Sequence, residues 1–387
     1  MAELERRTLL KGSVGVAALG ASAAALKWGF NTPDRKQNPA DCQAKDVSAT
    51  DKRLIFSNWP EYIDEDDKKY VSTLTQFEKD TGIKVDYTAD VNDNNEFFAK
   101  VANQLGSCSS SKRDLFALTD WMAAKMIQVG WIQKLDASKV PNLHANIIDS
   151  LKSPGWDKKR EYSAPWQSGL TGIAYNKKKV GEVKSFSELL TRKDLKGRVT
   201  LLTEMRDTMG FMLLLEGADP SNFTDAQWQK AMERLKKADG DGQFRAFTGN
   251  DYVQDLASGN VLAAEAWSGD IANAGDDNLV WIPPEEGIMI WADNMLIPNL
   301  ATHKDNAEEW INYYYEPEVG AKLANYNSYI CPVKGAQEAM EKVNPENVHN
   351  ELIFPTEKTL SQTHGFMALD EAKSRTYEGD FSSVTAS

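Results

Sequence analysis

The sequence predicts an α/β protein in which two units of similar size follow one another along the chain. Segments with the alternation of a β-strand take turns with segments whose apolar residues recur at helical spacing, which is typical of sheets flanked by helices. This pattern begins near residue 53 and starts again after Trp166. A length of 387 residues also suits roughly two domains, each with a sizeable core.

In the first unit we expect three strands that alternate with helices. Thr81-Gly82 ends the first of these helices, because glycine readily adopts the left-handed conformation found at helix ends. The predicted strands are residues 53–57, 83–87 and 114–118, and the predicted helices are residues 71–79, 97–105 and 122–129.

The second unit repeats this alternation with shorter segments. An apolar segment at 288–290 runs into Trp291, and we expect that strand to end there. The other predicted strands are residues 172–175, 199–202 and 261–267, and the predicted helices are residues 186–190, 209–215 and 308–315.

The composition excludes several classes of protein. The chain carries 44 Lys and Arg against 57 Asp and Glu, a formal charge of −13, which disfavours nucleic acid because phosphate binding needs clustered basic residues. Only three Cys and four scattered His are present, without a CxxC or HExxH motif, so we expect no metal site and no cofactor. Hydrophobic residues at 41% fit a folded globular protein, and 11 Trp give it an excess of aromatic rings.

The first segment has the layout of an export signal. Residues 1–27 contain Arg6 and Arg7 and then an apolar run over 13–26, which is shorter than a membrane-spanning helix and resembles a twin-arginine signal. We therefore expect export to the periplasm or the cell surface, with residues 28–50 as a tether. An uncleaved signal that anchors the protein to the membrane is the alternative.

The cysteines bear on this interpretation. Cys42 is a weak candidate for lipid attachment, because Pro39-Ala40-Asp41 is a poor lipobox. Three Cys permit at most one intramolecular pair. A structural disulfide is not favoured, because twin-arginine passengers fold in the reducing cytoplasm before export.

Tryptophan and acidic side chains coincide at the ends of the predicted strands. Ligands of open α/β sheets bind beyond the carboxyl ends of strands, and ionised carboxylates are costly to bury in a core. Trp faces attract ammonium groups and cover methylenes, while carboxylates supply charge-assisted hydrogen bonds. The pattern therefore predicts a site for an elongated organic polycation, although packing in the core is the alternative for any single Trp. The segments concerned are Asn58-Trp59, Thr119-Asp120-Trp121, Thr203 to Asp207, Trp267 to Asp270 and Trp291 to Asn294.

An ordered series of motifs over residues 52–370 resembles the spermidine/putrescine-binding receptors of polyamine ABC transporters. The resemblance implies the two-lobed venus-flytrap fold of type II periplasmic binding proteins, in which each lobe is a central β-sheet flanked by helices. It also implies capture of putrescine or spermidine between the lobes and delivery to a membrane permease with its cytoplasmic ATPase. The motifs are NWPEY (58–62), FEKDTGIKV (77–85), LTDWMAAKM (118–126), WIQKLD (131–136), GIAYN (172–176), LLTEMRD (201–207), AWSGD (266–270) and IWADNMLIP (290–298).

The same resemblance assigns a ligand site. Acidic contacts to the ligand nitrogens would come from Glu204, Asp207 and Asp293, and Thr119 would keep a hydroxyl group beside them. The aromatic cage would consist of Trp59, Tyr62, Trp121, Trp267, Trp291 and Tyr329.

This sequence departs from the family pattern at several of these positions. Trp121 stands where relatives more often have Tyr, and Asp120 is an additional acid. Pro60 replaces a hydroxyl residue after the first Trp, so we do not expect one backbone-adjacent polar contact of the family pattern here. Arg206 lies between Glu204 and Asp207 in the sequence and could form an ion pair with either. Such an ion pair is the alternative to a role of these two acids in ligand binding. Gln362 is a further candidate, as the match to a polar residue of the C-terminal tail.

For the lobes, the resemblance implies that each is built from two segments, 51–163 with 293–340 and 164–292 with 341–387. We expect a monomer without enzymatic activity. One alternative is a receptor of the same fold for a quaternary amine, thiamine or ferric ion; Tyr313 to Tyr315 resemble tyrosines of ferric-ion receptors, but their amphipathic helix predicts packing in the core. An exported hydrolase with a carboxylate pair is less favoured, because no partner base is recognisable.

Overall fold

The computed structural model describes residues 41–68 and 70–385. The predicted export signal, residues 1–27, and most of the predicted tether lie outside the described residues. Within the part of the chain that is described, no helix has the length and apolar character needed to cross a membrane.

The first half of the chain forms the strands and helices that the sequence predicts. Helix α2 begins after Ser72, whose hydroxyl accepts the Thr75 amide, and it ends at Gly82 with φ 72°, the left-handed conformation expected there. The elements are β1 (Arg53–Asn58), α2 (Thr73–Thr81), β2 (Lys84–Ala89), α3 (Asn94–Gly106), β3 (Leu115–Thr119), α4 (Asp120–Gln128) and α5 (Pro141–Asn146).

The remaining elements include several that the sequence pattern did not predict, among them the long helices α8 and α15. They are β4 (Ser163–Asn176), α6 (Phe186–Thr191), β5 (Val199–Leu202), α7 (Met205–Leu215), α8 (Asp225–Gly240), β6 (Phe244–Thr248), α9 (Tyr252–Ser258), β7 (Ala263–Trp267), α10 (Ser268–Asn273), β8 (Leu279–Ile282), β9 (Ile288–Leu296), α11 (Lys304–Tyr314), α12 (Pro317–Asn327), α13 (Ala336–Val343), α14 (Glu357–Leu360), β10 (Thr363–His364) and α15 (Glu371–Thr385). Short 3-10 helices lie at Asp149–Leu151, Lys193–Leu195 and Pro345–Asn347.

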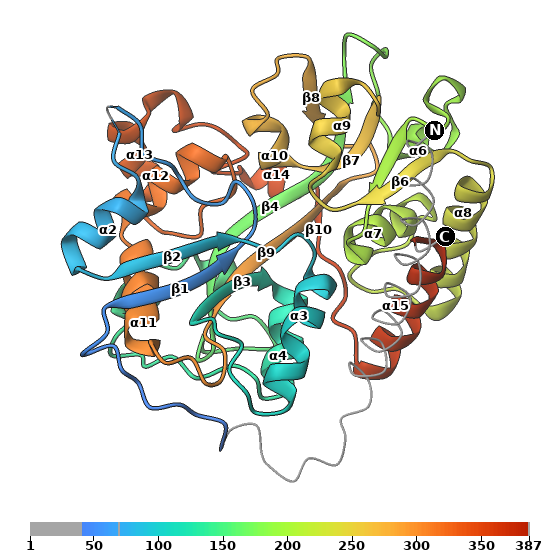
Figure 1. Ribbon diagram of the computed structural model, residues 1–387. Coiled ribbons are helices and arrows are strands. Elements are labelled where there is room, and N and C mark those ends of the chain that lie inside the picture. The colour runs from blue at the N-terminus through green and yellow to red at the C-terminus, as the bar shows by residue number, and fades with distance from the viewer. Residues whose placement is uncertain (1–40, 69, 386–387) are drawn as a thin grey trace, which may run out of the picture.

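The strands form one mixed sheet with the order β2-β1-β3-β9-β4-β7-β5-β6, to which β8 adds on β4 and β10 on β9. The outer strands pair in parallel, as expected for alternating strands and helices. Strands β4 and β9 are antiparallel and run through the middle of the molecule, joining the half that holds β1 to β3 to the half that holds β5 to β7 (Figure 1). These two strands are therefore the main connection between the halves.

Strand β4 is much longer than the predicted segment 172–175. It is buried along its whole length, so it lacks the alternation of polar and apolar residues that reveals a half-exposed strand. The pairing register of β4 with β9 shifts between Pro165 and Ser168, which places a bulge where the strand passes from one half to the other.

The molecule has two large hydrophobic cores, and the first extends from the half with β1 to β3 into the other half, where it includes Leu202, Tyr252 and Ala266. In the first core the Phe56 ring lies 6.1 Å from that of Trp310, and in the second Phe186 stacks on Phe211 with 4.3 Å between ring centroids. Trp267 joins the first core because its ring lies 6.1 Å from that of Trp59. The division of the chain into lobes at the boundaries given above stays a prediction.

The cysteines correct the sequence-based expectation. Cys42 forms a disulfide with Cys108, with their Cα atoms 5.5 Å apart, and Cys331 is free and buried. A sulfur in a disulfide cannot carry a lipid, so the candidate lipid site at Cys42 is also wrong. The expectation that folding in the reducing cytoplasm disfavours a disulfide was wrong for two reasons. The fold brings Cys42 and Cys108 together, and their thiols can be oxidised after export.

Candidate functional site

A cavity of about 910 Å³ lies at the junction of the two halves, and all ten predicted site residues line it. They reach it from the ends of β1, β3, β5 and β7, from the middle of β9 and from the loop after α12. This is the position expected for a ligand in an open α/β sheet. The residues are Trp59, Tyr62, Thr119, Trp121, Glu204, Asp207, Trp267, Trp291, Asp293 and Tyr329.

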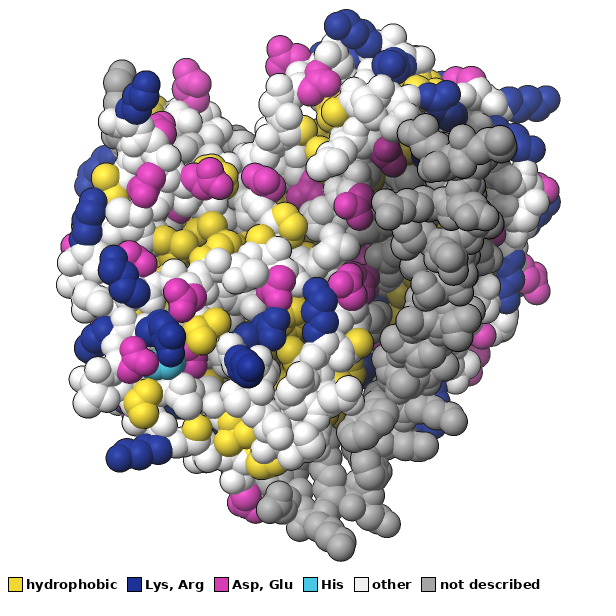
Figure 2. Space-filling view, viewed as in Figure 1, with side chains coloured by type: hydrophobic (Ala, Val, Ile, Leu, Met, Phe, Trp, Pro, Cys, Tyr) yellow, Lys and Arg dark blue, Asp and Glu magenta, His cyan; other side chains and the backbone are white. Residues whose placement is uncertain are grey.

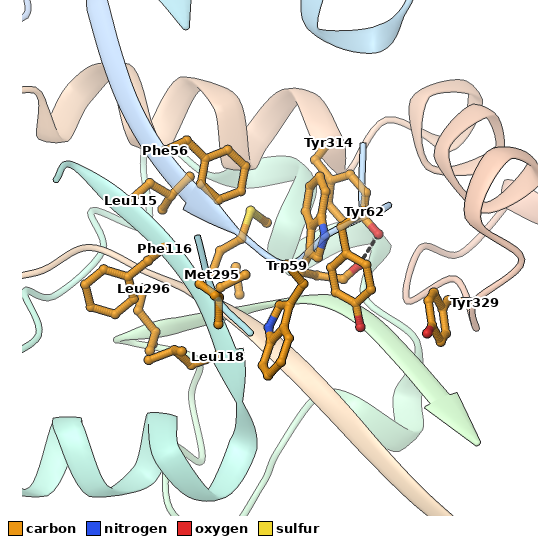
Figure 3. Close-up of a cluster of buried hydrophobic side chains, with 14 of the residues drawn as sticks. Phe56, Trp59, Tyr62, Leu115, Phe116, Leu118, Met295, Leu296, Tyr314 and Tyr329 are labelled. Atoms are coloured by element: carbon orange, nitrogen blue, oxygen red, sulfur yellow. Dashed lines mark hydrogen bonds between the residues drawn. The ribbon is translucent and has the colours of Figure 1, made fainter. Parts of the chain in front are cut away.

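Five of the six predicted cage aromatics form a closed ring of contacts. Each neighbour lies 5.2 to 6.5 Å away between ring centroids, in tilted or edge-to-face geometry. Figure 3 shows Trp59, Tyr62 and Tyr329 beside the buried strands that carry Leu118 and Met295. In contact order the ring runs Trp59, Tyr62, Tyr329, Trp291, Trp267 and back to Trp59.

The polar atoms of four of these rings are anchored by hydrogen bonds. Because each ring is held at its polar edge, its orientation is fixed before any ligand arrives. Tyr62 Oη donates to Asp293 Oδ2 at 2.8 Å, Tyr329 Oη to Asp270 Oδ1 at 2.7 Å, Trp267 Nε1 to Asp207 Oδ2 at 3.0 Å and Trp291 Nε1 to Thr171 Oγ1 at 3.0 Å.

Two glycines make room for this arrangement. A Cβ atom at Gly169 of β4 would lie 2.4 Å from the Trp291 ring and 2.9 Å from the Tyr329 ring. A Cβ atom at Gly269, in α10, would lie 2.5 Å from Tyr329. The two rings therefore pack directly against backbone, which only glycine permits at these positions.

Trp291 and Asp293 do not follow the end of a strand, as the sequence suggested, because β9 continues to Leu296. They are two residues apart on a strand and so point to the same side of the sheet. Thr119, the register partner of Asp293 on β3, donates its hydroxyl to Asp293 Oδ1 at 2.8 Å. The cavity is thus lined by the face of a central strand as well as by loops.

The acids in the cavity hold their protons unusually tightly. Burial raises the pKa of Asp293 to about 7 and that of Asp207 to about 6. Burial also raises the pKa of Asp270, which accepts hydrogen bonds from Tyr252, Asn250 and Tyr329. A cation placed among these carboxyl groups would favour their ionised forms and lower the pKa values again.

Trp121 stands apart from the ring of aromatics and faces a cation of the protein itself. The guanidinium carbon of Arg206 lies 3.5 Å from the centre of the Trp121 ring, and Arg206 Nη1 lies 3.8 Å from Glu204 Oε1. Glu204 also accepts hydrogen bonds from Asn94 Nδ2 at 3.1 Å and from Trp121 Nε1 at 3.3 Å. Arg206 therefore pairs with Glu204, whereas Asp207 bonds to Trp267.

Several residues around the cavity were not among the predicted site residues. Asp270 was noted in the strand-end pattern, but its role in fixing Tyr329 required the fold. Asp120 lines the cavity, and burial raises the pKa of its carboxyl to about 6. Gln362 is exposed, and the segment after it, residues 365–369, lines the cavity instead. Other polar residues that line the cavity are Asn94, Lys125, Gln128, Arg206, Asn250 and Ser374.

The structure also bears on the alternatives. Tyr314 and Tyr315 are buried and donate their hydroxyls to the backbone carbonyls of Trp166 and Pro165, which confirms that they pack in the core.

Acidic side chains elsewhere are interspersed with Lys and Arg on the face shown in Figure 2. The acids that matter for a ligand are therefore the few that lie inside the cavity.

Comparison with known proteins gives a consistent result. The family model of the bacterial extracellular solute-binding proteins matches residues 72–353. The spermidine/putrescine-binding periplasmic protein 1 of Haemophilus influenzae is 28% identical, over 88% of this chain and 90% of its own. The putrescine-binding periplasmic protein PotF of Escherichia coli is 30% identical, over 78% of this chain and 83% of its own.

Solved structures share the fold. A protein from Listeria monocytogenes aligns with a TM-score of 0.74 at 26% identity, over 86% of this chain and 98% of its own. The substrate-binding protein PotD of a spermidine/putrescine ABC transporter from Streptococcus pneumoniae aligns with a TM-score of 0.68 at 24% identity, over 86% of this chain and 98% of its own.

Proposed function

This chain belongs to the bacterial extracellular solute-binding proteins, and on that premise we propose that it is the receptor of an ABC transporter for a polyamine such as putrescine or spermidine. The relatives named above carry these ligands in their names. The protein works outside the cytoplasm, binds its ligand without chemical change and presents it to a membrane permease. A cytoplasmic ATPase drives the transport, and the receptor acts as a monomer.

The observation that carries this proposal is the ring of five aromatic side chains with Asp207 and Asp293 bound to its edges. The faces of Trp and Tyr attract ammonium groups by their quadrupole and cover the methylenes between them. The carboxylates supply charge-assisted hydrogen bonds to the ammonium groups. Aromatic faces and acids in one buried cavity therefore match the alternation of charge and hydrocarbon along a polyamine.

Capture would proceed by closure of the two halves around the ligand. Strands β4 and β9 connect the halves, and the bulge of β4 between Pro165 and Ser168 marks where they can bend. A ligand held by residues of both halves has more contacts in the closed state, so its binding favours closure.

Isothermal titration of the purified protein with putrescine, spermidine and spermine tests the proposal. We expect saturable binding of at least one of them, and no displacement by a neutral diol of the same chain length, because the diol lacks the ammonium groups. Absence of binding heat for all three amines, together with no thermal stabilisation by any, would contradict the proposed function.

A quaternary amine is the second candidate, since an aromatic cage also suits a cation without N–H groups. The carboxyl groups of Asp207 and Asp293 favour the primary amine, because they are placed to accept hydrogen bonds that a quaternary ammonium cannot donate. A thermal-shift panel with choline and betaine beside the polyamines separates the two, since the tighter ligand gives the larger rise in melting temperature.

A further inference from the structure

We propose that Arg206 permanently fills one amine position of the site, so that the receptor selects a diamine over longer polyamines. This inference rests on the proposed function and names the ligand within the polyamine class. It starts from the observation that one predicted cage residue, Trp121, and one predicted acid, Glu204, already surround a cation of the protein.

The guanidinium of Arg206 has the contacts that a ligand ammonium group would need. Its carbon lies 3.5 Å from the centre of the Trp121 ring, a cation–π distance. Glu204 faces it at 3.8 Å, and Glu378 of α15 faces it at 3.5 Å between Nη2 and Oε1. The aromatic face and the acid at this end of the cavity are therefore both engaged.

Arg206 is buried in this place between two acids, at 3.8 Å from Glu204 and 3.5 Å from Glu378, and its Nη1 makes no hydrogen bond within the described residues. The residue is 9% exposed and is the second residue of α7, while Glu378 belongs to the C-terminal helix, so the cation connects two elements far apart in the sequence. A ligand that displaced the guanidinium would leave two acids without their partner and would have to move a buried charge. The cation thus belongs to the wall of the cavity, which it also lines.

Besides Glu204, three acids line the cavity, namely Asp207, Asp293 and Asp120, and the last of these lies within electrostatic reach of Arg206. Asp207 and Asp293 border the ring of five aromatics, and neither is paired with Arg206. Two ammonium groups separated by a short hydrocarbon chain satisfy both acids. A third ammonium group at Asp120 or Glu204 would have to approach Arg206, where like charges repel.

Titration of the wild-type protein and of Arg206→Gln with putrescine and spermidine tests this inference. We expect the wild type to bind putrescine more tightly, and the Arg206→Gln variant to shift the ratio of the two dissociation constants toward spermidine by about tenfold or more. Arg234→Gln is the matched control, because Arg234 of α8 pairs with Glu216 outside the cavity, and its ratio should equal that of the wild type.

The ratio of the putrescine and spermidine dissociation constants of the wild type tests the inference even if the Arg206→Gln variant does not fold. Equal or tighter binding of spermidine by the wild type overturns the inference, and so does an unchanged ratio in a folded Arg206→Gln variant. Both outcomes leave the proposed function intact, because a polyamine still binds. A wild-type protein that binds no polyamine overturns the proposed function and this inference together.

Discussion

Asp293 has the central position among the single residues of the site. It is 2% exposed, and its two oxygens accept hydrogen bonds from Tyr62 and Thr119, which come from different parts of the chain. The carboxyl group therefore both orients a ring of the cage and offers charge to a ligand. Replacing this carboxyl group with the amide of Asn should weaken ligand binding more than it destabilises the fold. The amide has the same shape and keeps one acceptor oxygen, but it carries no charge.

We expect Asp293→Asn to weaken polyamine binding by about 1–3 kcal/mol, because it removes the charge from a hydrogen bond to a cation. Isothermal titration measures the loss. Asp241→Asn is the control, since Asp241 forms an exposed ion pair with Lys237 away from the cavity. Equal affinities in the wild type and Asp293→Asn would remove Asp293 from the site.

The raised pKa values of Asp293, about 7, and Asp207, about 6, predict a pH dependence of ligand-induced stabilisation. Both pKa values lie above those of Asp in the unfolded chain, which are about 4. The two carboxyl groups therefore stabilise the ligand-free folded protein fully below about pH 4, and this contribution is lost as the pH rises through about 6 to 7. A bound ammonium group reverses that loss by favouring the ionised forms.

The rise in melting temperature caused by saturating putrescine should therefore be larger at about pH 8 than at about pH 5.5, while the amine stays charged throughout. Differential scanning fluorimetry measures it, and Asp293→Asn should flatten the dependence. A larger rise at the lower pH would be incompatible with these carboxyl groups binding the cation.

Among the elements, β4 shows how a strand is adapted to the site. Its Gly169 allows the Trp291 ring of β9 to lie against the backbone, and its bulge places the change of direction between the halves. Strand pairing alone does not require glycine at position 169. Glycine is needed there because the rings of Trp291 and Tyr329 pack against the backbone.

Gly169→Ala should reduce the free energy of unfolding by about 1–3 kcal/mol and weaken polyamine binding, because the added methyl group pushes Trp291 and Tyr329 out of place. Chemical denaturation and titration measure the two effects. Gly181→Ala is the control, since a Cβ atom there has nothing within 4 Å. Normal binding by a folded Gly169→Ala variant would show that the ring positions are not critical.

The disulfide between Cys42 and Cys108 ties the start of the described chain to the turn after α3, across a sequence separation of 66 residues. Closing a loop of that length stabilises the fold by about 4 kcal/mol in the chain-entropy description. Dithiothreitol should lower the melting temperature of the wild type and leave that of a Cys42→Ser, Cys108→Ser variant unchanged. A reductant without effect on the wild type would mean that the bond does not form in solution.

For the whole molecule, the type II periplasmic-binding-protein fold is confirmed by the structural relatives. Several hydrogen bonds join residues of opposite predicted lobes beside the cavity, among them those of Trp121 to Glu204 and of Tyr329 to Asp270. Thr203 Oγ1 donates to Asp93 Oδ2 at 2.9 Å, and Asn94 Nδ2 donates to Glu204 Oε2 at 3.1 Å. They indicate a conformation in which the two halves are close together, the state that a bridging ligand would favour.

Putrescine should therefore reduce the radius of gyration of the wild-type protein in small-angle scattering, since it shifts the population toward this compact state. The Asp293→Asn variant, at the same ligand concentration, should show a smaller change. Saturable binding without any change in radius would rule out closure as the mechanism of capture.

Local patterns were sufficient for much of the fold. The strands at 53–57 and 199–202 and the helix at 186–190 were predicted within a few residues, because the spacing of their apolar side chains depends on the element alone. The amphipathic helix α8 was overlooked although its spacing was readable, whereas β4 was underestimated because a fully buried strand carries no such spacing.

By itself, the sequence determined that strands and helices alternate and that Trp and acidic residues lie near one another along the chain, since both depend on neighbouring positions. Only the tertiary structure decided that β9 runs through Trp291 to Leu296, that Arg206 pairs with Glu204 and stacks on Trp121, and that Cys42 meets Cys108. These contacts join residues from different elements, and the way the elements pack selects each pair from several that the sequence permits.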